Sequence, residues 1–141
     1  LQTKKNTMKR LLSSQSLNTN LAALALRLIL GGLFIYHGYG KLENYQMYLG
    51  MSKSLIGLGA KTEFNLVIFA EFFCGILVTV GFLTRLTVIP IFITMAVAFF
   101  IAHAKDAFMM KELAFIFLVL CIPVFILGSG RYSVDRQLNR K

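Results

Sequence analysis

Two ionisable side chains lie inside stretches of the sequence that are otherwise apolar. Arg27 interrupts the apolar residues 21–39, and Glu71 interrupts the apolar residues 64–82. A charge near the middle of a bilayer costs about 2.5 to 3.5 kcal/mol on insertion scales, so charged residues there are usually paired or functional. Arg27 and Glu71 are therefore the first candidates for chemistry.

The two charges have two interpretations. Each residue lies about seven positions inside its apolar stretch, from opposite ends, which places the two Cα atoms within about 6 Å of the same level. One interpretation is an ion pair that joins the first two spans and fixes their register. The other is a polar pocket in which Glu71 handles protons and Arg27 holds the charge state of Glu71.

Two histidines favour the pocket. His37 and His103 fall at the ends of their apolar stretches, on the same side of the membrane, close to Tyr36, Lys41 and Glu112. The pocket would suit the head group of a quinone, whose carbonyls need donors and whose reduction consumes two protons. Single histidines at a membrane interface also occur with no ligand. The candidate ligand-binding residues are Arg27, His37, Lys41, Glu71, His103 and Glu112.

The same histidines and carboxylates are also the side chains that bind Zn, Cu or Fe. The sequence has no HxxH or CxxC spacing, and its two histidines both lie near one membrane surface, which is unfavourable for haem. No metal site is predicted. No residue is assigned as a catalytic nucleophile, and Glu71 is the candidate for proton handling.

Four apolar stretches long enough to cross a bilayer position these residues. They cover residues 21–39, 64–82, 86–104 and 113–127, in a chain of 141 residues that is 57% hydrophobic. The sequence predicts an all-α integral membrane four-helix bundle at 20–130, with a basic polar tail at 1–19 and a second at 131–141. The lipid bilayer is the first expected partner.

The connections are predicted from glycines and periodicity. Gly38 and Gly40 are expected to end the first span. Apolar residues at helical spacing from Tyr45 to Ile56 predict a short amphipathic helix in the interface, which Gly57 then breaks. A tight hairpin at residues 81–86 joins spans two and three.

The net charge of +9 is interpreted as membrane topology and not as nucleic-acid binding, because the basic residues lie in tails and loops. Nine of the 15 Lys and Arg residues lie on the side of both termini, which the positive-inside rule assigns to the cytoplasm. The expected location is a bacterial or archaeal cell membrane. Met8 is a candidate natural start, and the polar residues 13–20 argue against a cleavable signal peptide.

Several short motifs occur in an order typical of one family. They are the run from Arg27 to Gly32, the run from His37 to Leu42, Glu71 with Gly75 and Gly81, Thr84 with Arg85, His103, and the exit motif at 128–135. Over about residues 20–136 the chain resembles the DoxX family of small four-helix membrane proteins. The resemblance implies a quinone-linked redox role, because relatives look like small membrane subunits of quinone oxidoreductases. Its matching polar positions are Arg27, Lys41, Glu71, Arg85 and His103.

The leading hypothesis is a small membrane subunit of a quinone-linked redox system. The chain lacks a flavin motif, a pair of haem ligands and the cysteines of an iron–sulfur cluster, so a protein partner or a homo-oligomer is expected. One alternative is a non-catalytic scaffold or accessory subunit in which Arg27 and Glu71 are structural. The third is a transporter of small molecules or metals.

Overall fold

The computed structural model describes Ser13 and residues 18–139, and this part of the chain contains helices and no strands. Almost all of the predicted tail 1–19, including Met8, lies outside the described residues. The elements are α2 (Thr19–Glu43), α3 (Tyr45–Met51), α4 (Ala60–Ile68), η1 (Phe69–Phe73), α5 (Cys74–Val80), α6 (Thr84–Val97), η2 (Ala98–Ala102), α7 (Phe108–Leu127) and α8 (Val134–Leu138). Here η marks a π-helical turn.

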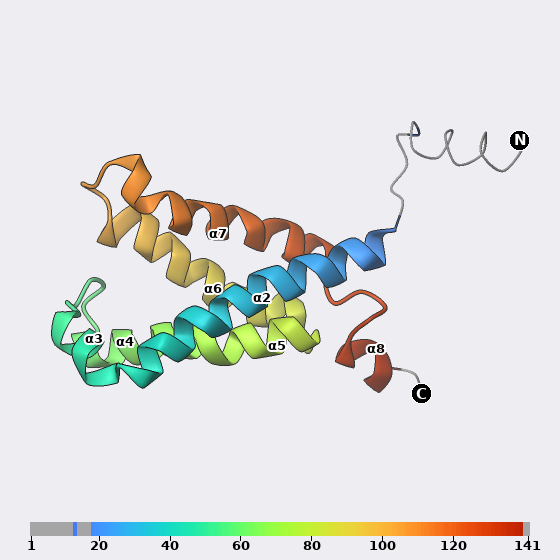
Figure 1. The fold of residues 1–141 in the computed structure, drawn as a ribbon, viewed down its shortest axis with the longest axis horizontal. Helices are drawn as coiled ribbons and strands as arrows, with labels where there is room; N and C mark the ends of the chain where they lie inside the picture. Colours follow the sequence, from blue (N-terminus) through green and yellow to red (C-terminus); the bar gives the residue numbers. More distant parts are fainter. Residues whose placement is uncertain (1–12, 14–17, 140–141) are drawn as a thin grey trace, which may run out of the picture.

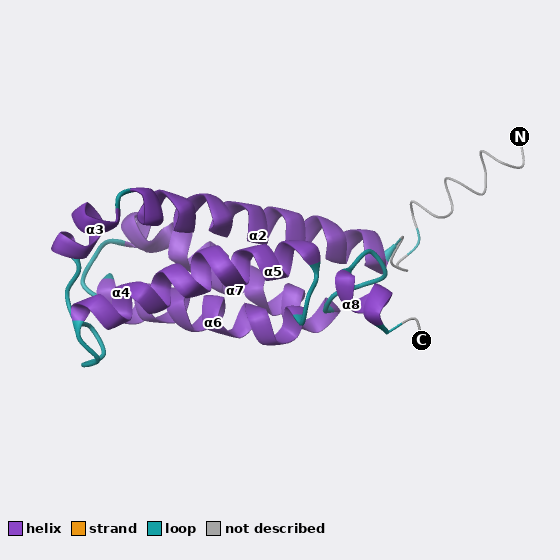
Figure 2. Ribbon diagram, turned by 90° about the horizontal axis from the view of Figure 1, so that it is seen from below, coloured by secondary structure: helices purple, strands orange, loops and turns teal. Residues whose placement is uncertain are grey.

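Four continuous helical rods are long and apolar enough to cross a membrane: Thr19–Glu43, Ala60–Val80, Thr84–Ala102 and Phe108–Leu127. They run up and down in sequence order, and each packs against its neighbour in a closed ring in which α7 returns to α2. Figures 1 and 2 show both ends of the described chain at one end of the bundle, called here the terminal end. The opposite end, which carries α3 and the η2–α7 turn, is called the distal end. The predicted four-span helical bundle is confirmed.

Glycines set the register between α2 and the second rod. A Cβ added to Gly31 would lie 2.7 Å from the carbonyl oxygen of Gly75, and one added to Gly38 would lie 2.6 Å from the backbone nitrogen of Phe72. Such close backbone approach compensates for the absence of a hydrophobic driving force between helices in lipid. The prediction that Gly38 and Gly40 end the first span was wrong, because α2 continues to Glu43 and Gly38 is part of a helix contact.

The core lies between the four rods. Phe34 of α2 and Phe117 of α7 pack against each other with their ring centroids 4.8 Å apart and their planes tilted by 48°. Around them pack buried side chains from every rod, among them Leu30, Cys74, Val78, Val88, Ile91, Met95, Cys121 and Val124. Large apolar side chains also cover the outside of the bundle, as expected for a surface that faces lipid.

The connections at the two ends differ in construction. At the terminal end, Gly81 (φ 75°) and Leu83 (φ 47°) adopt left-handed conformations and form the predicted hairpin. At the distal end the predicted interfacial helix is present as α3, but it ends at Met51, earlier than expected. The following loop is held by Glu63, whose carboxylate accepts hydrogen bonds from the backbone of Leu55, Ile56 and Leu58 and from the hydroxyl of Ser54.

Candidate functional site

A cavity of about 250 Å³ opens near the distal end of the bundle and gathers four of the six predicted site residues. Its polar lining consists of His37, Lys41, Glu71 and His103. Its apolar lining comes from Phe34, Met95, Met110, Leu113, Ala114 and Phe117. The combination of apolar walls with a few convergent polar groups is typical of a ligand pocket, and the volume suits a single ring more than a drug-sized molecule.

An ion pair forms one side of this cavity. The ammonium group of Lys41 on α2 donates a hydrogen bond to Glu71 Oε2 in the π-helical turn η1. The Glu71 side chain is only 6% exposed, whereas that of Lys41 is 25% exposed. The carboxylate is thus held inside the bundle by a cation that can also reach the cavity.

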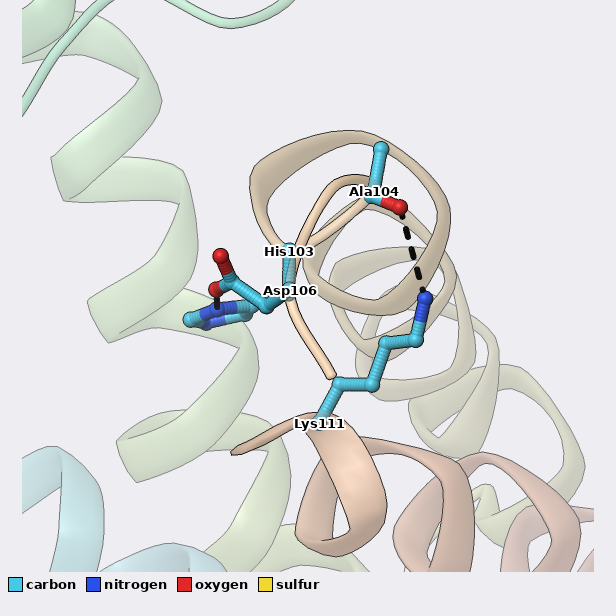
Figure 3. A network of polar contacts seen from close by, with 4 residues as sticks. All are labelled: His103, Ala104, Asp106 and Lys111. Atoms are coloured by element: carbon cyan, nitrogen blue, oxygen red, sulfur yellow. Dashed lines mark hydrogen bonds and ion pairs between the residues drawn. The ribbon is translucent and has the colours of Figure 1, made fainter. Parts of the chain in front are cut away.

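A second polar network lies in the turn between η2 and α7, which contributes His103 to the cavity lining (Figure 3). His103 Nδ1 lies 2.7 Å from Asp106 Oδ2, which fixes the orientation of the imidazole ring. Lys111 closes the same turn: its ammonium group donates to the carbonyl of Ala104 at 3.5 Å and lies 5.0 Å from the centroid of the Phe99 ring. The network leaves the second ring nitrogen of His103 without a hydrogen bond to any described residue.

His37 reaches the cavity from α2, one helical turn before Lys41. Its ring packs edge-on against Phe117 at 6.0 Å between centroids and against Tyr36 at 5.6 Å. Tyr36 itself is 74% exposed and points away from the cavity, to the surface. Among the described residues no hydrogen-bond partner is seen for the His37 imidazole, so both ring nitrogens are free to bind a ligand.

Two of the four polar residues of the site, Glu71 and His103, lie in or directly after a π-helical turn. Glu71 lies in η1, where Cys74 N bonds to the carbonyl of Phe69, and His103 follows η2, where its own backbone N bonds to the carbonyl of Ala98. A π turn inserts one extra residue into a helix and is frequent at functional sites. Here each insertion lies level with the cavity, which supports the assignment of this region as the functional site.

The predicted pairing of Arg27 with Glu71 was wrong. The contacts of Gly31 with Gly75 and of Gly38 with Phe72 place Glu71 level with residue 38, which is about 16 Å along α2 from Arg27 at 1.5 Å per residue. The levels of the two residues were predicted by counting from the ends of the apolar stretches. That count was wrong because α2 runs from Thr19 to Glu43 and so extends beyond the apolar residues 21–39 at both ends. The ion pair of Glu71 is made with Lys41 instead.

Arg27 and Glu112 do not line the cavity. Arg27 is 1% exposed near the terminal end, where its Nη2 donates to the carbonyl of Tyr132. Glu112 is exposed on the first turns of α7. Over residues 18–139 no group of three or more His, Cys, Asp and Glu side chains is placed to hold a metal ion.

Sequence reasoning did not single out Asp106, Met95 and Met110 as site residues. The spacing of His103 and Asp106, three residues apart in a helix-ending turn, is a signal that could have found the first. Met95 and Met110 look like ordinary apolar residues of their spans, and only the packing of α6 against α7 brings them to the cavity.

Comparison with known proteins agrees with this architecture. The DoxX family model matches residues 22–104, more than half of the chain. The inner membrane protein YqjF of Escherichia coli is 31% identical over 86% of this chain and 95% of its own length. The uncharacterized membrane protein Rv3486 of Mycobacterium tuberculosis is 30% identical over 85% of this chain and 83% of its own length. No solved structure matches.

The four spans, the family match and these two relatives define a multi-pass bacterial membrane protein. The chain belongs to the DoxX family.

Proposed function

We propose that the distal cavity binds the head group of a quinone and that the protein is a small membrane subunit of a quinone-linked redox system. The observation that carries the proposal is the gathering of His37, Lys41, Glu71 and His103 around one cavity with apolar walls. The imidazole of His37 and the ammonium of Lys41 supply donors for the carbonyl oxygens of a quinone ring. Glu71, held by Lys41, and His103, held by Asp106, supply groups able to exchange protons.

The proposal includes a protein partner that supplies electrons. The only two cysteines, Cys74 and Cys121, are buried in the core as free thiols, so they cannot ligate an iron–sulfur cluster. The helix best suited to face such a partner is α7, because it has the smallest share of buried residues among the four spans. The same exposed face supports the alternative function of an accessory subunit that stabilises a larger complex without binding quinone.

The proposal also places the cavity on the outer side of the membrane. By sequence, nine of the 15 Lys and Arg residues belong to the two tails and the loop at Arg85, and the positive-inside rule assigns that side to the cytoplasm. Reporter fusions to the C-terminus test this orientation: a reporter active only in the cytoplasm should be active, and one active only outside should not.

The test of quinone binding is to purify the protein in mild detergent and to measure bound quinone by mass spectrometry and by titration with a soluble quinone. Glu71→Gln removes the carboxylate of the cavity, and Glu112→Gln is the matched control, because Glu112 is exposed at the same end outside the cavity. Quinone retained by wild type and Glu112→Gln but lost by Glu71→Gln would support the proposal.

A wild-type protein that carries no quinone and takes none up in the titration would contradict quinone binding. If that protein co-purifies with a larger complex whose stability is unchanged by His37→Ala and His103→Ala, the accessory-subunit function takes its place.

A further inference from the structure

We infer that the terminal end of the bundle carries a second site, which binds a phosphate group. A pocket of about 700 Å³ lies there, lined mainly by the segment that follows α7. Its charged lining residues are Arg131 and Arg136, and no acidic residue lines it. The remaining lining is Val80, Tyr132, Ser133, Val134 and Gln137. This pocket is independent of the distal cavity and of quinone binding.

A buried cation lies directly behind the pocket. The guanidinium of Arg27 contacts Gly81, next to the lining residue Val80: a Cβ added to Gly81 would lie 2.8 Å from Arg27 Cζ and 2.6 Å from Ser133 Cβ. Tyr132, another lining residue, accepts the single hydrogen bond of Arg27. Arg27 thus supports the pocket wall from the inside.

Most of the hydrogen-bonding capacity of Arg27 is unused. Its side chain is 1% exposed, and its Nε and Nη1 have no hydrogen-bond partner among the described residues. Buried polar groups are normally satisfied, and an unsatisfied one often marks a place where a ligand or ion belongs. Arg27 adds positive charge behind the wall, whereas the guanidinium groups that line the pocket, and that suit the oxygens of a phosphate, are those of Arg131 and Arg136.

Among the described residues, Arg27 makes no ion pair with an acidic side chain. Asp135 acts on Arg27 electrostatically, but the described residues show no ion pair between them. The Asp135 carboxylate is already engaged, because it accepts hydrogen bonds from the backbone of Leu83 and the hydroxyl of Ser129. The two arginines that line the pocket, with Arg27 buried behind its wall, outnumber the one carboxylate of Asp135, so the site has the net positive charge that an anion requires.

The phosphate can come from two sources, a lipid head group or a soluble phosphate. The four helices are long enough to cross a bilayer, so the terminal end of the bundle is expected at the level of the lipid head groups. An anionic phospholipid can present its phosphate there. The distinguishing probes are phosphatidylglycerol, phosphatidylcholine and inorganic phosphate, each added to the purified full chain.

The test measures lipid binding by native mass spectrometry of the protein in detergent. It compares wild type with the double variant Arg131→Gln/Arg136→Gln, called here the arginine variant. The matched control is Lys61→Gln/Lys105→Gln, which removes the same charge at exposed positions of the distal end. Phosphatidylglycerol should bind wild type and control alike and should bind the arginine variant about tenfold more weakly. Arg27→Lys, which keeps the positive charge behind the pocket wall, should bind phosphatidylglycerol about as well as wild type.

The two sources give different results. Preference for phosphatidylglycerol over inorganic phosphate assigns the site to a lipid, and protection against thermal unfolding by millimolar inorganic phosphate in wild type alone assigns it to a soluble ligand. The inference would be overturned if phosphatidylglycerol bound equally to wild type and to the arginine variant, or if none of the three probes, phosphatidylglycerol, phosphatidylcholine and inorganic phosphate, bound to wild type. If Arg27→Lys does not fold, the Arg131 and Arg136 variant still decides the matter.

Discussion

Lys41 and Glu71, thirty residues apart in the chain, form an ion pair between α2 and the π-helical turn η1. The pair is relevant to both proposed functions, quinone binding and the stabilisation of a larger complex. It joins the first two rods, and it also brings a charged donor and a carboxylate to the wall of the cavity. Its structural and binding contributions can be separated by substitution.

Lys41→Met should destabilise the protein by about 3 kcal/mol, at the low end of the range for breaking a buried pair, because Lys41 is a quarter exposed while Glu71 is left buried without its cation. The double variant Lys41→Met/Glu71→Leu should recover most of this loss. Unfolding in mixed micelles measures both. A single variant as stable as wild type would show that the pair contributes nothing to stability.

The glycines of α2 offer a comparison within one helix. Gly31→Ala should cost about 1 to 3 kcal/mol, because the new methyl group would lie 2.7 Å from the carbonyl oxygen of Gly75. Gly32→Ala is the control: nothing lies within 4 Å of its new Cβ, and the gain in helix propensity should stabilise by up to about 1 kcal/mol. Equal effects of the two substitutions on the free energy of unfolding would contradict the packing described.

Asp106 should affect ligand binding through His103. Asp106→Ala removes the acceptor that orients the imidazole, so quinone affinity should fall several-fold, whereas Asp106→Asn keeps an acceptor and should lose less. Titration of both variants with the same soluble quinone is the measurement. Affinity unchanged in Asp106→Ala would exclude a positioning role, and unchanged helicity by circular dichroism would show that the fold is intact.

The segment after α7 is attached to the hairpin by Asp135. Its carboxylate accepts from Leu83 N at 2.9 Å and its backbone N donates to the carbonyl of Gly81 at 3.2 Å. Asp135→Ala should cost about 1.5 to 3 kcal/mol, the range for hydrogen bonds to charged groups, and should expose residues 131–139 to protease. Gln137 lies on the same short helix, and its side chain makes no hydrogen bond to another described residue, so Gln137→Ala should leave the cleavage rate unchanged. Equal cleavage rates of Asp135→Ala and wild type would refute the attachment.

Much of the fold follows from the sequence because its strongest signals are long and local. Four apolar stretches, the hairpin at Gly81 and the short helix after Glu43 are each predicted from neighbouring residues, and each is present. The resemblance to DoxX proteins also rested on short local motifs, and it is confirmed.

The site was only partly predictable because it depends on the register between helices. His37, Lys41, Glu71 and His103 meet as expected. His37, Lys41 and His103 lie near the distal ends of their rods, and Lys41 reaches Glu71 in the middle of the second rod. The partner of Arg27 could not be predicted, since it comes from a contact 105 residues away with the backbone of Tyr132, and no pattern of side-chain types reveals a backbone carbonyl. Close contacts between glycines, which set the register, leave no periodic signal.

The π turns have a consequence for the comparison of DoxX sequences. Each turn accommodates one residue more than an α-helix would, at 69–73 and at 98–102, without interrupting the rod. Relatives with a one-residue gap at either place are expected to have a regular α-helix there, with every preceding side chain rotated by about 100° relative to the rest of the rod. In a relative with the gap at 69–73, a carboxylate aligned with Glu71 would face lipid or a neighbouring helix. Gaps in an alignment, and not only substitutions, would then separate members that keep this cavity from members that have lost it.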